Sequence, residues 1–90
     1  MTEILKLKKK IIYRSNYRGC KETDLIIGSF AKIHTSKMPL QDLKRFLEIL
    51  DESDDLLYKW ITKKAPLPNK YKSSKVFKQI IEHTSKFLNE

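Results

Sequence analysis

The segment LQDLKRFLEIL, residues 40–50, carries the clearest structural pattern in this 90-residue sequence. Its apolar side chains recur every third or fourth residue, at Leu40, Leu43, Phe46, Leu47 and Leu50. That spacing places them on one face of an α-helix. The preceding Pro39 suits the first position of a helix. The segment therefore predicts an amphipathic helix that begins near residue 39 and ends before the acidic run 51–55.

Helical patterns also occupy residues 3–17, 22–34 and 73–88, and a short stretch after Ser53. The segment 22–34 has the widest apolar face, so we expect it to be the most buried helix. The apolar residues that we expect on the buried faces are Ile4, Leu5, Ile11, Ile12, Leu25, Ile26, Phe30, Ile33, Leu56, Leu57, Trp60, Ile61, Val76, Phe77, Ile80, Ile81, Phe87 and Leu88.

Polar residues and prolines predict where the later helices begin and end. Ser53 or Asp54 can cap the short helix, and Ser73 or Ser74 can cap the last one. The run 65–69, with its two prolines, stops the short helix and forms a loop.

The chain length allows one domain, residues 1–90. Only two glycines and three prolines are present, which disfavours turn-rich β architectures. Helices joined by short loops then predict an all-α fold, a compact five-helix bundle.

Composition excludes several classes of site. The single Cys20 cannot form an intramolecular disulfide, and two histidines are too few for a Cys/His zinc site. The acidic run 51–55 lacks the spacing of a calcium-binding loop and indicates helix caps and solvated faces. No nucleotide-binding or hydrolase motif occurs, so we expect no bound metal and no tightly bound cofactor. No apolar run is long enough to span a bilayer and no signal peptide is visible, so we expect a soluble protein in a reducing compartment.

The formal net charge is +8, and most of the excess lies at the N-terminus. Residues 1–21 hold seven basic residues and one acidic one, a net +6, whereas residues 22–90 are nearly balanced. Such a patch attracts an acidic partner surface or a phosphate group. General lysine enrichment explains the charge equally well, since 16 of the 19 basic residues are lysine. A small nucleic-acid-binding or regulatory helical module is the alternative that this charge keeps open.

Residues 13–24, YRSNYRGCKETD, hold two of the three arginines, one of the two glycines and the only cysteine. One reading is structural: Arg18 pairs with Glu22 or Asp24 to fix a corner between two helices, and Gly19 serves as a hinge. Such a surface pair contributes only about 0–1 kcal/mol, which is a weak reason for the cluster. The other reading is that the corner binds a partner.

The segment from Arg18 to Leu25 resembles the RGxxExD signature of the FAD assembly factors of succinate dehydrogenase. The resemblance continues through Gly28-x-Phe30-Ala31 and the block Asp54-Asp55-Leu56-Leu57-Tyr58-x-Trp60-Ile61-Thr62, and covers about residues 10–70. Members often carry a glycine after the Trp-Ile-Thr block, where this chain has Lys63, so the local loop geometry is in question.

The resemblance implies a five-helix bundle that binds the flavoprotein subunit of succinate dehydrogenase, and in some bacteria that of fumarate reductase. It implies an assembly factor rather than an enzyme, one that promotes covalent attachment of FAD to a histidine of that subunit. FAD is then carried by the partner, and neither nucleic acid nor membrane insertion is involved. We expect a monomer in a one-to-one complex, in the bacterial cytoplasm or, in a eukaryote, the mitochondrial matrix.

Carried over residue by residue, the signature places Arg18, Gly19, Glu22 and Asp24 at the flavoprotein interface. Arg14 lies one helical turn before Arg18 and is a plausible second contact. Asp24 is alternatively an internal partner that orients Arg18.

Overall fold

The computed structural model describes residues 2–18 and 21–88, and these residues form helices and loops without a strand. The helices are α1 (Thr2–Asn16), α2 (Lys21–His34), the 3-10 helix η1 (Thr35–Lys37), α3 (Leu40–Leu50), α4 (Asp54–Ile61), α5 (Asn69–Lys72) and α6 (Lys75–Leu88). All five predicted helices are present, and the all-α prediction is confirmed. The short η1 and α5 were not predicted. No helix among the described residues is both long and apolar enough to cross a bilayer.

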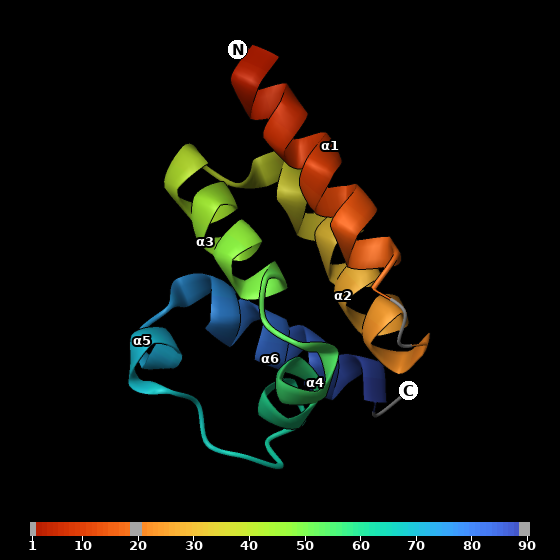
Figure 1. The fold of residues 1–90 in the computed structure, drawn as a ribbon, viewed down its shortest axis with the longest axis vertical. Coiled ribbons are helices and arrows are strands. Elements are labelled where there is room, and N and C mark those ends of the chain that lie inside the picture. Colours follow the sequence, from red (N-terminus) through yellow and green to blue (C-terminus); the bar gives the residue numbers. More distant parts are fainter. Residues whose placement is uncertain (1, 19–20, 89–90) are drawn as a thin grey trace.

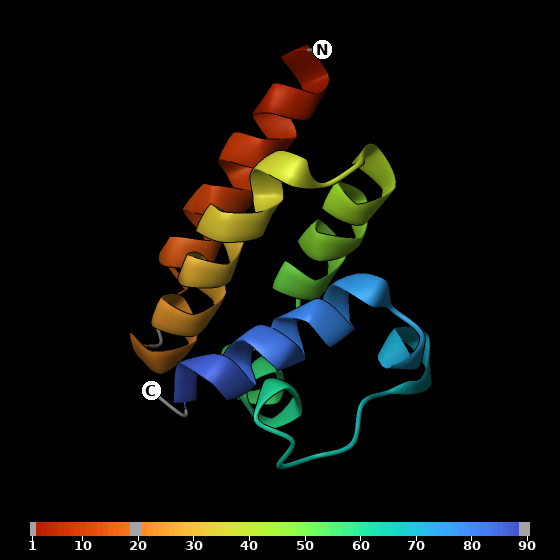
Figure 2. The same ribbon diagram turned by 180° about the vertical axis from the view of Figure 1, so that it is seen from behind.

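The first three helices form one layer and the rest pack across one end of it. In Figures 1 and 2, α1 and α2 lie side by side in opposite directions, with α3 beside them. The last helix, α6, runs across the lower ends of α2 and α3 in these views and contacts both of them. The short helix α4 also packs against α6. The C-terminal end of α1 and the start of α2 therefore lie near the junction between α3 and α4.

One hydrophobic core joins these helices. Its fully buried members include Ile11, Ile26, Phe30, Leu43, Phe46, Leu57, Phe77 and Ile80. Trp60 is 8 % exposed and packs its ring near those of Tyr71 and Phe77, as expected for a core residue. Such rings prefer tilted or edge-on contacts, and these fill the space between α4, α5 and α6.

Several residues predicted to be buried are exposed instead. They are Ile4, Leu5, Ile12, Leu25, Ile33, Leu40, Leu56, Phe87 and Leu88. In α1 only one side of the helix contacts α2 and α3, and that side carries Ile11. In α2 the buried face is centred on Ile26, Ile27, Phe30 and Ala31. The periodicity of the apolar residues predicted the helices correctly. It does not indicate which edge of a wide apolar face contacts a neighbouring helix.

Short-range hydrogen bonds form the predicted helix caps and the turn that follows α4. Ser53 caps α4 by accepting the backbone N–H of Leu56, and Ser74 accepts that of Phe77 at the start of α6. After α4, Lys63 has a φ of 65°. The N–H of Lys64 donates to the carbonyl of Lys59 at 2.8 Å, which closes the helix end with the left-handed residue that glycine usually supplies.

Candidate functional site at the corner between α1 and α2

The predicted site residues gather where α1 ends at Asn16 and α2 begins at Lys21. Gly19, which the signature places at the interface, lies outside the described residues, as does Cys20. The other four predicted residues, Arg14, Arg18, Glu22 and Asp24, are described. They do not all face the same way, and this difference decides what each can do.

Arg18 turns into the protein. Its Nε donates to Oδ1 of Asp54 at 2.5 Å, and the two terminal nitrogens donate to the carbonyls of Leu50 at 2.7 Å and Glu52 at 2.6 Å. Its side chain is only 8 % exposed. A buried charge is stable only when it is paired and hydrogen-bonded, and the planar guanidinium satisfies all three acceptors at once.

The expected pairing of the Arg18 side chain with Glu22 or Asp24 is therefore wrong. The carboxylate that neutralises it, on Asp54, lies 36 residues away. Asp24 still contributes, because its Oδ1 accepts the backbone N–H of Arg18 at 2.8 Å. Asp24 thus holds the main chain of the corner while Asp54 holds the side chain.

Arg14 reaches the same end of α3 from one turn earlier. Its Nη2 donates to Oδ1 of Asp51 at 2.5 Å and to the carbonyl of Leu50 at 3.3 Å. Both arginines thus bind the last carbonyl of α3, where cations interact favourably with the helix dipole. We call Arg14, Arg18, Asp51 and Asp54 the arginine clamp. It fastens the α1–α2 corner to the α3–α4 junction.

Glu22 is the predicted residue that faces outward. It is exposed in the first turn of α2, and it forms no hydrogen bond or ion pair with another residue of the described ranges. A carboxylate in the first turn of a helix is favoured by the positive end of the helix dipole. Such a group can receive a cation or an N–H donor from a partner.

The acidic run 51–55 was underestimated from the sequence. Besides the two aspartates of the clamp, Glu52 accepts the Tyr71 hydroxyl at 2.6 Å and lies 3.0 Å from Nζ of Lys70. The Tyr71 hydrogen bond, followed by that of Lys70, lowers the pKa of Glu52. Burial, and then the bond to Glu52, raises the pKa of Tyr71. The one sequence signal was an excess of acidic residues just after a predicted helix end.

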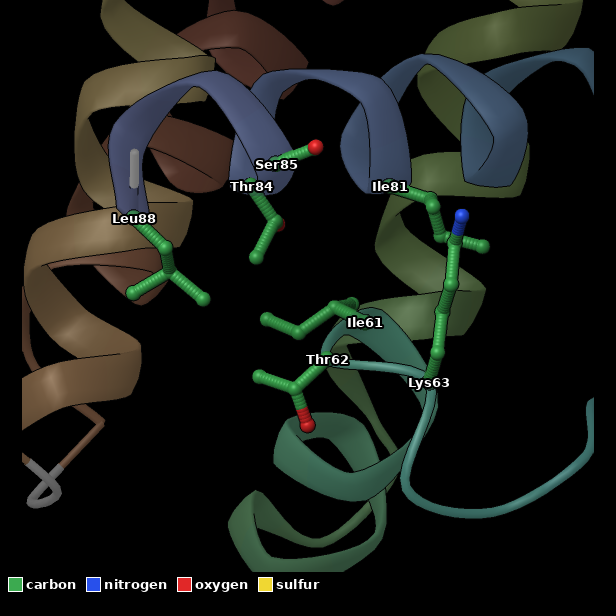
Figure 3. A pocket seen from close by; sticks show the side chains of 7 residues that line it. All are labelled: Ile61, Thr62, Lys63, Ile81, Thr84, Ser85 and Leu88. Carbon is green, nitrogen blue, oxygen red and sulfur yellow. The ribbon is translucent and has the colours of Figure 1, made fainter. Parts of the chain in front are cut away.

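Away from the corner, the described residues offer no metal cluster, and the pocket between α4 and α6 is small. Among the described residues, no group of three His, Cys, Asp or Glu side chains could hold a metal ion. The pocket in Figure 3, between α4 and α6, has a volume of about 160 Å³ and is lined by Ile61, Thr62, Lys63, Ile81, Thr84, Ser85 and Leu88. Ligand pockets usually measure roughly 300–1,000 Å³, so this one does not fit a flavin dinucleotide.

Comparison with known proteins places this corner within a family match. The family model described as "Flavinator of succinate dehydrogenase" matches residues 9–84, which extends the expected region 10–70 into α6.

Similar proteins named "Succinate dehydrogenase assembly factor 2, mitochondrial" occur in three well-separated organisms. The identities are 36 % over 83 residues in Dictyostelium discoideum, 39 % over 80 in Saccharomyces cerevisiae and 40 % over 75 in Schizosaccharomyces pombe. These alignments cover 92 %, 86 % and 82 % of this chain, and 58 %, 49 % and 53 % of the relatives. The chain thus spans about half the length of the curated relatives it matches.

Proposed function

Because this chain belongs to the family of flavinators of succinate dehydrogenase, we propose that it is an assembly factor for the flavoprotein subunit of that enzyme. It promotes covalent attachment of FAD to a histidine of the subunit. The observation that carries the proposal is the signature corner, where the arginine clamp and Asp24 hold the chain and leave Glu22 exposed. A rigid corner that presents one exposed carboxylate is suited to recognition of a partner surface.

The signature residues have different roles in this proposal. Glu22 contacts the subunit directly, and Gly19 permits its backbone to approach closely. Arg18 positions both residues, because its guanidinium is buried against Asp54. Arg14 and Asp24 support the same geometry from α1 and from α2. Arg14 remains half-buried, with 31 % of its side chain exposed, so it is able to contact the subunit as well.

The chain acts without being the catalyst. Attachment takes place between the flavin and a histidine that both belong to the subunit, and the bound chain holds a subunit conformation in which the two are aligned. Alignment alone accelerates a reaction, since it removes the entropic cost of bringing the groups together. FAD is carried by the subunit. The chain works as a monomer in a one-to-one complex, and fumarate reductase is a second flavoprotein that the same corner serves.

We place this activity where the subunit acquires its flavin: in the bacterial cytoplasm, or in the mitochondrial matrix of a eukaryote. The relatives named above carry the word mitochondrial in their names. Nucleic-acid binding is less well supported, because two of the seven basic residues of the N-terminal segment, Arg14 and Arg18, are neutralised within the protein by Asp51 and Asp54. Phosphate contacts need such groups to be free on the surface.

The test is covalent flavin on the subunit, read as in-gel fluorescence after denaturation. The flavoprotein subunit is expressed alone, with this chain, and with its Glu22→Ala variant. We expect fluorescence to rise with the chain and to return toward the level of the subunit alone with Glu22→Ala. Glu82→Ala is the matched control, because Glu82 is an exposed glutamate on α6. Equal fluorescence with and without the chain would contradict the proposal.

A further inference from the structure

The outward side of α1 carries an apolar stripe next to the corner. Lys9, Ile12, Tyr13, Asn16 and Tyr17 line a shallow hollow along this helix. Steps of three or four residues lead from Lys9 to Ile12 and Tyr13, and from these to Asn16 and Tyr17, so the five share one side of the helix. We call them the tyrosine stripe. In Figures 1 and 2, α1 lies along the edge of the molecule, with α2 and α3 on its inner side.

The two tyrosines of the stripe are unusually exposed. Tyr13 is 65 % and Tyr17 71 % exposed, and their ring centroids lie 4.7 Å apart. Ile12 beside them is 40 % exposed. Neither tyrosine hydroxyl is hydrogen-bonded to another residue of the described ranges. Single exposed apolar residues are common, whereas a contiguous aromatic patch marks an interaction surface.

The stripe is continuous with the proposed docking corner. Tyr13 directly precedes Arg14, and Tyr17 directly precedes Arg18. Because both arginines are fixed to the α3–α4 junction, the last turn of α1 is held in place relative to the end of α3. The two rings therefore stand on a rigid support at the end of α1 that leads into the corner. Rigid aromatic anchors contribute most of the energy in many protein interfaces.

Charge around the stripe indicates what it meets. Lys6, Lys9 and Lys10 are exposed along the same helix, where Glu3 is the sole acidic residue. Arg14 and Arg18 add no free charge, since each is paired with an aspartate. The surface that complements this one is apolar at its centre and acidic at its edge.

We propose that the tyrosine stripe is the second half of the docking surface, and that it packs against an apolar, acid-rimmed area of the flavoprotein subunit. This inference rests on the proposed function, which supplies the partner. In the complex, Tyr13 and Tyr17 bury their rings as anchors and Glu22 makes the polar contact. Lys9 and its neighbours speed the encounter through long-range attraction.

The experiment measures the affinity of purified chain for purified flavoprotein subunit, by calorimetry or by surface-based binding. The variants are Tyr13→Ala/Tyr17→Ala, Tyr13→Phe/Tyr17→Phe and Glu22→Ala. We expect the double alanine variant to bind at least about 30-fold more weakly, as for two hot-spot aromatics. The phenylalanine variant, which keeps both rings, should stay within about threefold of the wild-type affinity.

Leu40→Ala is the matched surface control. Leu40 is 37 % exposed and begins α3 ten residues before Leu50, which places it about 15 Å from the clamp. This variant should bind like the wild type. Thermal unfolding of the double alanine variant should also be unchanged, because both rings are largely outside the core.

The outcomes separate this inference from the proposed function. If the double alanine variant keeps its affinity and Glu22→Ala loses it, the tyrosine stripe is not part of the docking surface. The proposed function would then still stand. If the wild-type chain does not bind the subunit at all, both fail. A wild-type chain that self-associates, and that becomes monomeric in the double alanine variant, would assign the stripe to a second copy of this chain and overturn the inference.

Discussion

The two chain reversals at Arg18 and at Lys63 are held in opposite ways. At the α1–α2 corner, side chains cross 32 to 37 residues of sequence to reach the end of α3 and the residues after it. At the end of α4, the backbone bonds only to residues within the preceding turn, and Lys63 takes the left-handed conformation. The first geometry depends on the folded bundle, and the second depends on local chemistry. Only the first has a reason to be coupled to function.

The largest expected effect is therefore at Arg18. The variant Arg18→Ala leaves two carbonyls and the partly exposed Asp54 carboxylate without their donor, a loss that should cost about 2–4 kcal/mol. We expect this decrease in the free energy of unfolding, measured by urea denaturation. Flavinylation should fall with it, because the corner loses its attachment to α3.

Two controls sharpen this prediction. In Arg18→Ala/Asp54→Ala the second substitution removes the unpaired charge, so the double variant should be more stable than the sum of the single losses implies. Arg14→Ala should cost about 1 kcal/mol or less, because its partner Asp51 is 68 % exposed. Equal losses for Arg14→Ala and Arg18→Ala would show that burial does not separate the two arginines.

The second expected effect is at Glu52, which ties the α3–α4 junction to α5. Its folded-state pKa lies below the ordinary value of 4.5 because of the bonds from Tyr71 and Lys70. The associated stability is present above pH 4.5 and is lost as the pH falls through the lowered pKa. The variant Glu52→Gln should lose about 1–3 kcal/mol at pH 7.

The pH dependence distinguishes this interaction from simple packing. We compare the free energies of unfolding of wild type and Glu52→Gln by urea denaturation at pH 7 and at pH 3. The difference between the two proteins should be smaller at pH 3. Thr62→Ala, which removes the neutral bond to the Tyr58 carbonyl, is the control whose loss should not vary with pH over that range. If Glu52→Gln loses as much free energy of unfolding at pH 3 as at pH 7, the stabilisation does not depend on the ionised Glu52 carboxylate.

Most of the features that depend on contacts between residues close in sequence were predicted, and those that depend on distant contacts were not. Five of the helices (α1, α2, α3, α4 and α6), the caps at Ser53 and Ser74 and the core position of Trp60 depend on local spacing, and these were predicted. The pairing of Arg18 with Asp54 was missed, because Glu22 and Asp24 were nearer in sequence and equally acidic. Nothing in a single sequence shows which of several carboxylates a buried arginine will meet.

The outward residues were misjudged for a related physical reason. Periodicity assigned Ile12 and Leu25 to the core, whereas both are exposed. A helix face wider than its contact area leaves apolar residues at one edge, and only the packing of α1 on α2 and α3 decides which edge. Tyr13 and Tyr17 were noted as part of an unusual segment, but the contact between their rings and their exposure needed the fold.

The smallest expected effect tests the local reversal, and it has the opposite sign. Lys63 occupies a left-handed position at φ 65°, where a residue with a Cβ is disfavoured by about 1–2 kcal/mol. Glycine removes that cost but adds conformational entropy to the unfolded chain. The variant Lys63→Gly should therefore gain about 0.5–1 kcal/mol in the free energy of unfolding.

Lys64→Gly is the matched control: among the described non-glycine residues only Lys63 has a positive φ, so this neighbour should lose stability. Because the reversal is held locally and lies away from the corner, neither variant should change flavinylation. A stabilised Lys63→Gly chain with reduced activity would instead show that the strained turn takes part in docking, and would break the separation between the two reversals.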